Sequence, residues 1–130
     1  MFQPFFIARK IVRYGILDKN FRGREMEKPI LVFCTVPDEN TARLLAKALV
    51  DARLAACVNC SAASCSVYRW EGKVEEAREF VLTIKTVSGR YDAVETTIKS
   101  MHPYDLPEIL AVPVLRGLAS YLDWVIDETA

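Results

Sequence analysis

The chain has 130 residues, 52% of them hydrophobic and 26% charged, and its formal net charge is zero. A chain of this length forms one domain whose core needs neither disulfides nor metals. This excludes the class of small proteins that depend on disulfides or bound metals for stability. No apolar stretch reaches the roughly 20 residues that a membrane helix needs. The apolar fraction exceeds what a monomer of this size normally buries, so we expect an oligomer.

The charges divide the chain into two parts. Residues 1–28 hold seven Lys/Arg and three Asp/Glu, a net charge of +4. Residues 29–130 hold ten Lys/Arg and fourteen Asp/Glu, a net charge of −4. Binding to nucleic acid rests on neutralising phosphates, so the acidic second part argues against a nucleic-acid partner. Such a surface is better suited to cations.

Residues 1–28 form a predicted N-terminal extension outside the domain of residues 29–130. Apolar residues surround Arg9, Lys10 and Arg13, and no acidic residue precedes Asp18. This pattern is typical of a surface-binding helix or an organelle-targeting segment. Alternatively, translation starts at Met26, immediately before the first predicted strand. We expect contact with a membrane only if residues 1–25 provide it.

The first half of the predicted domain consists of a buried strand, a helix and an interrupted strand. The continuous apolar run of residues 30–36 predicts a strand that is buried on both faces. Asp38 or Asn40 can cap the next helix, and apolar residues at spacings of three and four predict that it extends over residues 38–53. A second strand begins at residue 56 and resumes at residues 64–70, after an interruption by small residues.

The second half begins with a turn at Glu71-Gly72-Lys73, which predicts a hairpin. Alternating side chains predict a long returning strand over residues 74–86, then a helix over 91–100, a strand over 108–114 and a terminal helix over 118–128. The order β-α-β-β-α-β-α predicts an α+β fold with the ferredoxin-like split-βαβ arrangement, an antiparallel sheet with helices on one face. The opposite face then needs a cover, and self-association with two-fold or three-fold symmetry provides one.

The four cysteines are Cys34, Cys57, Cys60 and Cys65, and we expect them to be reduced. The chain has no convincing secretory signal and its core is adequate without disulfides, which favours a cytoplasmic location. Cys57 and Cys60 have C-x-x-C spacing. However, residues three apart in a strand point to opposite faces, and no second pair completes a zinc site. We interpret Cys60 and Cys65 as small buried hydrophobic residues.

Five segments stand out between residues 30 and 126. They are VFCTVPD at 32–38, LAACVN at 54–59, YRWEGK at 68–73, KT at 85–86 and HPYDLPE at 102–108. In order and spacing, these segments resemble the CutA, or divalent-cation tolerance, family. The resemblance implies a ferredoxin-like fold in a tight homotrimer whose long hairpin strands pair between subunits, with a shape similar to the P-II signalling proteins. It also implies a role linked to tolerance of copper and other divalent metals in bacteria, and to membrane anchoring of acetylcholinesterase in animals.

Cys34, Cys57 and His102 are the candidate metal ligands. Thiolate and imidazole together suit copper or zinc, and histidine is the commonest metal ligand. The resemblance implies that cysteines and a histidine at matching positions bind copper. The alternatives are an ordinary core thiol for Cys34 and a local hydrogen-bonding role for His102. We predict no cofactor apart from copper or another divalent metal ion.

A second candidate site is a ligand pocket between subunits, lined by Tyr68, Trp70, Lys85, Tyr104 and Glu108. Aromatic rings with a lysine and a carboxylate suit a small charged ligand. The alternative is interface packing, because Tyr and Trp are enriched at protein contacts in general.

The sequence therefore predicts a cytoplasmic homotrimer that binds a divalent metal, with copper as the first choice, and takes part in metal tolerance and homeostasis. The alternative function is a P-II-like signalling or scaffold trimer that binds a small ligand or a partner protein at the subunit interface. We expect no enzyme activity. His102 with Cys34 or Cys57 is the only thiol–imidazole combination, and no glycine-rich oxyanion or phosphate loop accompanies it.

Overall fold

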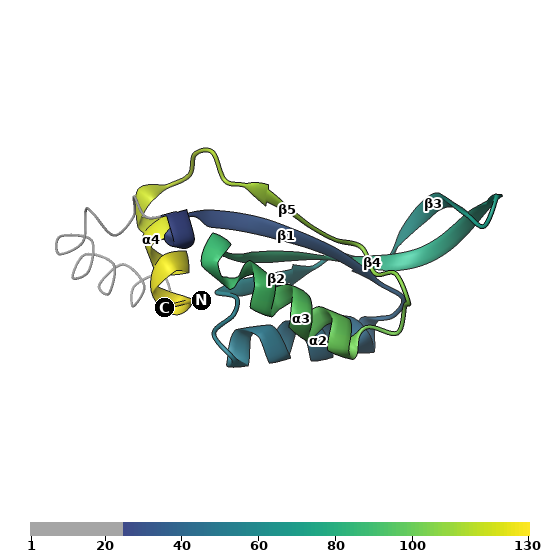
Figure 1. The fold of residues 1–130 in the computed structure, drawn as a ribbon, viewed down its shortest axis with the longest axis horizontal. Coiled ribbons are helices and arrows are strands. Elements are labelled where there is room, and N and C mark those ends of the chain that lie inside the picture. Colours follow the sequence, from purple (N-terminus) through teal and green to yellow (C-terminus); the bar gives the residue numbers. More distant parts are fainter. Residues whose placement is uncertain (1–24) are drawn as a thin grey trace.

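The computed structural model describes residues 25–130, so residues 1–24 of the predicted extension lie outside the described residues. Residues 25–130 form five strands, three helices and two short 3-10 turns, arranged as in Figure 1. The strands are β1 (Pro29–Val36), β2 (Cys57–Cys60), β3 (Ser64–Trp70), β4 (Lys73–Val87) and β5 (Ile109–Pro113). The helices are α2 (Glu39–Asp51), α3 (Tyr91–Met101) and α4 (Ala119–Glu128), and the turns are η2 (Glu25–Glu27) and η3 (Ser88–Arg90).

The predicted ferredoxin-like topology is confirmed. The strands form an antiparallel sheet in the order β2-β4-β1-β5, and β3 pairs with the other half of β4. The predicted second strand is divided into β2 and β3 by residues 61–63, as its small residues indicated. Helices α2 and α3 lie on one face of the sheet, and α4 lies at the end away from the hairpin (Figure 1). We call the face that α2 and α3 cover the helix face, and the opposite face of the sheet the open face.

Helix α2 begins where local chemistry predicts. Asp38 is its N-cap, and Oδ1 of Asp38 accepts a hydrogen bond of 2.7 Å from the backbone N–H of Thr41. This backbone hydrogen bond also lowers the pKa of the Asp38 carboxyl. The buried positions Ala42, Leu45 and Leu49 recur at spacings of three and four, so the apolar stripe of the helix faces the sheet.

The core lies between the helix face and the two helices. In β1, Val32, Cys34 and Val36 are fully buried while their neighbours are only half-buried, because alternate side chains of a strand point to opposite faces. They pack with Leu82 and Ile84 of β4 and with apolar residues of α2 and α3. Helix α4 adds a separate small cluster through Val125 and Ile126 against Val87.

The open face of the sheet is apolar, and among the described helices α4 covers only one end of it, at Val87 and Lys85. Leu31 of β1 pairs with Val112 of β5, and Phe33 pairs with Leu110, so these side chains form adjoining rows. Leu110 remains 48% exposed and Val112 38% exposed. A face of this kind is the expected position of a contact with another subunit.

The hairpin of β3 and β4 extends beyond the sheet (Figure 1). Its turn contains Glu71 at φ 50° and Gly72 at φ 81°, which are left-handed conformations typical of a tight hairpin turn. The exposed apolar side chains of this arm include Val67, Trp70 and Val74. The hairpin therefore presents unpartnered apolar surface, like the open face.

Candidate functional site

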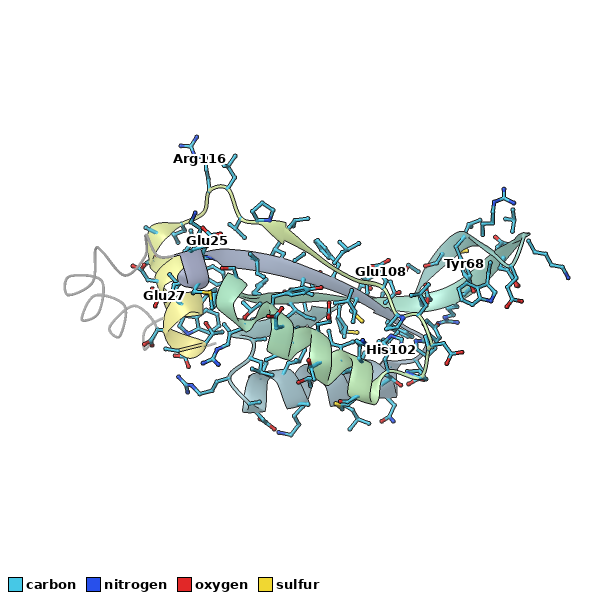
Figure 2. All side chains as sticks on the ribbon, viewed as in Figure 1. Glu25, Glu27, Tyr68, His102, Glu108 and Arg116 are labelled. Atoms are coloured by element: carbon cyan, nitrogen blue, oxygen red, sulfur yellow. The ribbon has the colours of Figure 1, made fainter. Side chains whose placement is uncertain are left out.

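A groove with a volume of about 740 Å³ lies where the hairpin leaves the sheet. Its walls come from β3 and from the loop of residues 103–108, and Thr35 and Glu79 contribute from β1 and β4. Figure 2 shows Tyr68, His102 and Glu108 at this end of the domain, far from Glu25 and Glu27 at the other end. We call it the hairpin groove.

Strands β3 and β4 position the groove residues on the side of the hairpin. Tyr68 and Trp70 are two positions apart in β3, so their side chains lie on the same face of the arm. Ser64 of the same strand pairs with Glu79 of β4, which puts Glu79 on that face where the arm joins the sheet. Tyr68, Trp70 and Glu79 all line the hairpin groove.

A side-chain hydrogen bond joins the loop wall to the strand wall. The Tyr104 hydroxyl donates to Oε2 of Glu79 at 2.9 Å. Burial, followed by this bond and the negative charge of Glu79, raises the pKa of Tyr104 to about 12. Glu79 is only 6% exposed, yet no Lys, Arg or His among residues 25–130 forms an ion pair with it.

The hairpin groove is negatively charged overall. Glu79, Asp105 and Glu108 line it, against one guanidinium, Arg69. The negative charges of the groove also act on the core. Burial raises the pKa of the Cys34 thiol to about 12, and the charges of Glu108 and Glu79 add to this effect. A buried carboxylate that lacks a positive partner is costly, so the groove is suited to a cation.

His102 anchors the loop that carries Tyr104. The carbonyl oxygen of Thr35 lies 2.7 Å from Nε2 of His102, so this nitrogen carries the proton and donates. The other ring nitrogen, Nδ1, accepts a hydrogen bond of 3.1 Å from the backbone N–H of Tyr104. Both nitrogens of this buried imidazole are therefore used within the protein.

The structure does not bring the three predicted metal ligands together within one chain. Cys34 points into the core on the helix face, where its direct partner across the strands is Leu82. Cys57 pairs with Lys85, next to the buried Ile84, so its side chain lies on the open face. No group of three or more His, Cys, Asp and Glu side chains in residues 25–130 is placed to hold a metal ion.

The other two cysteines differ from expectation in one respect. Cys57 and Cys60 point to opposite faces, as their spacing predicts, because they pair with Lys85 and Leu82 of β4. The prediction that Cys60 and Cys65 are buried is wrong, since both are exposed. Cys60 lies at the end of the edge strand β2 and Cys65 lies on the protruding arm, and neither position has a layer packed over it.

Four of the five residues predicted for the ligand pocket meet in the hairpin groove: Tyr68, Trp70, Tyr104 and Glu108. Lys85 does not belong to this group. It lies further along β4, with its ammonium 5.8 Å from the centre of the Tyr121 ring of α4. Within one chain the groove is lined mainly by carboxylates. The predicted pocket between subunits, with Lys85 in it, stays a prediction.

Sequence reasoning missed Glu79 and Asp105 as groove residues. The signal for Glu79 was its place in the alternation of β4, where it shares a face with Val81 and is opposed to Phe80. Its pairing with Tyr104 joins residues 25 positions apart, and local periodicity carries no information about such a contact.

Comparison with known proteins agrees with this fold. The family model described as CutA1 divalent ion tolerance protein matches residues 30–128. The chain belongs to the CutA1 family. Among curated CutA1 relatives, the "Divalent-cation tolerance protein CutA" of Thermus thermophilus is 45% identical over 104 residues, which are 80% of this chain and 99% of the relative.

A further relative and a solved structure extend the comparison. The human "Protein CutA" is 44% identical over 93 residues, which span 72% of this chain but only 52% of that protein. The solved structure of the divalent cation tolerance protein from Thermus thermophilus superimposes with a TM-score of 0.77, covering 78% of this chain and 99% of that one. Among the described residues of this CutA1 family member, no helix is both long and apolar enough to cross a membrane.

Proposed function

We propose that this CutA1 family member acts in the tolerance of divalent cations and binds the cation in the hairpin groove. The names of its relatives support the role. The observation that carries the choice of site is Glu79, a buried carboxylate with no positive partner among residues 25–130. A cation held by Glu79, together with Glu108 or Asp105 and water, would compensate that charge.

Copper is the first metal to test. For a given set of nitrogen and oxygen donors, affinity among divalent first-row metals rises towards Cu²⁺. The thiol and imidazole of Cys34, Cys57 and His102 remain the alternative ligand set for copper. Since these groups lie apart in one chain, such a site would need a rearrangement or groups from a second subunit.

We also propose that the working form is a homotrimer in the reducing cytoplasm. The apolar open face and the protruding hairpin support self-association, since both expose side chains that a soluble monomer normally covers. The four free cysteines support a reducing location. We propose no catalytic role for His102 and Cys34, because both nitrogens of His102 are bonded within the chain and burial favours the protonated thiol of Cys34.

A second candidate function is ligand binding in a P-II-like signalling or scaffold trimer. The volume of the hairpin groove favours this candidate, because about 740 Å³ is typical of a small-molecule site and far exceeds the space of a metal ion. In this case the groove would respond to a metabolite or a partner protein, and metal binding would be weak.

Calorimetric titration of the full chain with CuCl₂ tests the proposal. Glu79→Gln, which removes the charge but keeps the size, is expected to weaken copper binding about tenfold or more. Glu95→Gln is the matched control, since Glu95 also accepts a tyrosine hydroxyl, from Tyr91 at 2.7 Å, but lies on α3 outside the groove. Repeating the titration after alkylation of the thiols separates the ligand sets. Binding that survives Glu79→Gln but disappears on alkylation would overturn the groove as the metal site.

A further inference from the structure

The loop of residues 114–118, between β5 and α4, carries the two most exposed large apolar side chains of residues 25–130. Leu115 is 92% exposed and Leu118 is 73% exposed. Arg116 lies between them, is exposed, and forms no ion pair with any of residues 25–130. Leucines on both sides of a guanidinium form an apolar and basic surface, which is typical of a contact with another protein chain. We call this segment the leucine loop.

The leucine loop is held in place near both of its ends. The backbone N–H of Val114 donates a hydrogen bond of 3.2 Å to the carbonyl oxygen of Pro29. Gly117 packs against α4, since an added Cβ atom would lie only 3.1 Å from Cδ2 of Leu122. The backbone between these two points is therefore pre-organised, and its outward side chains bind a partner with little loss of conformational entropy.

The rim of the hairpin groove is complementary to the leucine loop. Asp105 and Glu108 line the groove and are exposed, and Leu106, between them in the chain, is 72% exposed. We call these three residues the rim. It offers two carboxylates and an apolar side chain to a surface made of one guanidinium and two leucines. Glu79 is buried in the groove and does not belong to the rim.

The leucine loop and the rim cannot meet within one chain. Glu108 immediately precedes β5 and the loop follows it, so the five residues of this strand separate them by about 17 Å. Figure 2 shows Glu108 and Arg116 at the two ends of this strand. We propose that the leucine loop of one subunit binds the rim of the hairpin groove of a second copy, with Arg116 paired to Glu108. A head-to-tail contact of this kind can close into a ring of three. The inference rests on the proposed homotrimer.

This contact would place the proposed cation site between two subunits. A loop that lies on the rim separates Glu79 from bulk water, and the attraction between a cation and a carboxylate strengthens as water is excluded. Arg116 neutralises the exposed Glu108 and leaves Asp105 beside Glu79 for the cation. The assembly would therefore complete the metal site without supplying the positive charge that Glu79 lacks.

Carbodiimide cross-linking of the full-length Arg116→Lys chain tests the inference. The reagent joins an amine directly to a carboxylate in contact with it. We expect an amide between position 116 of one chain and Glu108 or Asp105 of another, identified by mass spectrometry of the cross-linked dimer. Lys99, an exposed lysine of α3, is the internal control and should not be joined to these carboxylates. A trimer in which position 116 is joined to neither carboxylate would overturn the inference, and so would a monomer in light scattering.

Exchange of the two charges provides a second test. Arg116→Glu and Glu108→Arg are each expected to raise about tenfold the concentration at which half of the trimer dissociates in analytical ultracentrifugation. The double variant should recover most of this loss, because its charges are again opposite. Lys99→Glu makes the same change in net charge as Arg116→Glu and should have no effect. A double variant that dissociates as readily as the single variants would contradict the pairing.

The cross-linking result also separates this inference from metal binding. If copper binds through Glu79 while no cross-link forms at position 116, the metal proposal stands and this inference fails. If the cross-link forms and copper does not bind, the reverse holds.

Discussion

The hydroxyl of Tyr104 donates a hydrogen bond of 2.9 Å to Oε2 of Glu79, a residue 25 positions earlier in the chain. This bond joins the loop after α3 to the base of the hairpin, so it closes one side of the hairpin groove. It also stabilises the buried charge of Glu79, because a hydrogen bond to an ionised group is stronger than one between neutral groups. The same side chain therefore shapes the groove and stabilises the carboxylate that we propose as the cation ligand.

Tyr104→Phe removes this hydrogen bond and leaves Glu79 with less compensation. We expect the free energy of unfolding to fall by about 1–2 kcal/mol, measured by urea denaturation at pH 7. Tyr91→Phe is the matched control, because Tyr91 bonds Glu95, a carboxylate that is only half-buried whereas Glu79 is buried. The decrease in the free energy of unfolding should be smaller for Tyr91→Phe than for Tyr104→Phe. Equal decreases in the two variants would show that the burial of Glu79 does not increase the contribution of its hydrogen bond to stability.

His102 is predicted to be important for stability. In His102→Ala, the Thr35 carbonyl and the Tyr104 N–H lose their partners, so we expect a loss of about 2–3 kcal/mol in unfolding free energy. His102→Asn should recover part of it, since the amide oxygen can take the place of Nδ1. Thermal and urea unfolding of the two variants measure this. A His102→Ala protein as stable as the wild type would contradict the anchoring role.

Stability is expected to fall at high pH. The pKa of Cys34 is raised from 9.0 to about 12 and that of Tyr104 from 10.0 to about 12, so each group holds its proton more tightly when folded. The unfolded chain releases these protons first, and the unfolding free energy therefore decreases as pH rises from about 9 to 12. Cys34→Ser should flatten the first part of this decline, while Cys65→Ser, at an exposed position, should not. Parallel curves for wild type and Cys34→Ser would contradict the assignment.

The open face provides a test of self-association. Leu110→Asp places a charge on an apolar row of that face, and we expect it to convert trimers to monomers in light scattering at micromolar concentration. Leu44→Asp is the control, because Leu44 is similarly exposed, at 55%, but lies on the outer surface of α2. A trimer unaffected by Leu110→Asp would place the interface elsewhere.

The sequence predicted the elements well because their signals are local. The cap at Asp38, the turn at Glu71 and Gly72, and the alternation in β4 each depend on neighbouring residues, and the observed bounds differ from the predicted ones by one or two residues. The same alternation correctly separated Cys57 from Cys60. Local periodicity therefore sufficed for the topology.

The site was only partly predictable because its contacts are not local. Periodicity places Glu79 and Lys85 on the same face of β4, but it cannot say that Glu79 meets Tyr104 while Lys85 lies near Tyr121. It also cannot show that both ring nitrogens of His102 form hydrogen bonds, with Thr35 and Tyr104. These pairings depend on how the loop of residues 103–108 closes over the sheet, and they decide that the groove is acidic.

The central claim is that a cation binds in the hairpin groove against Glu79. Electron paramagnetic resonance of Cu²⁺ added to the full chain reads the donor atoms directly, with Glu79→Gln and Glu95→Gln measured beside the wild type. We predict a bound signal from oxygen donors that is kept in Glu95→Gln and lost in Glu79→Gln. A signal that persists in Glu79→Gln and shows nitrogen hyperfine coupling, or the g and copper hyperfine values of thiolate ligation, would contradict it and return the metal site to His102 and the cysteines.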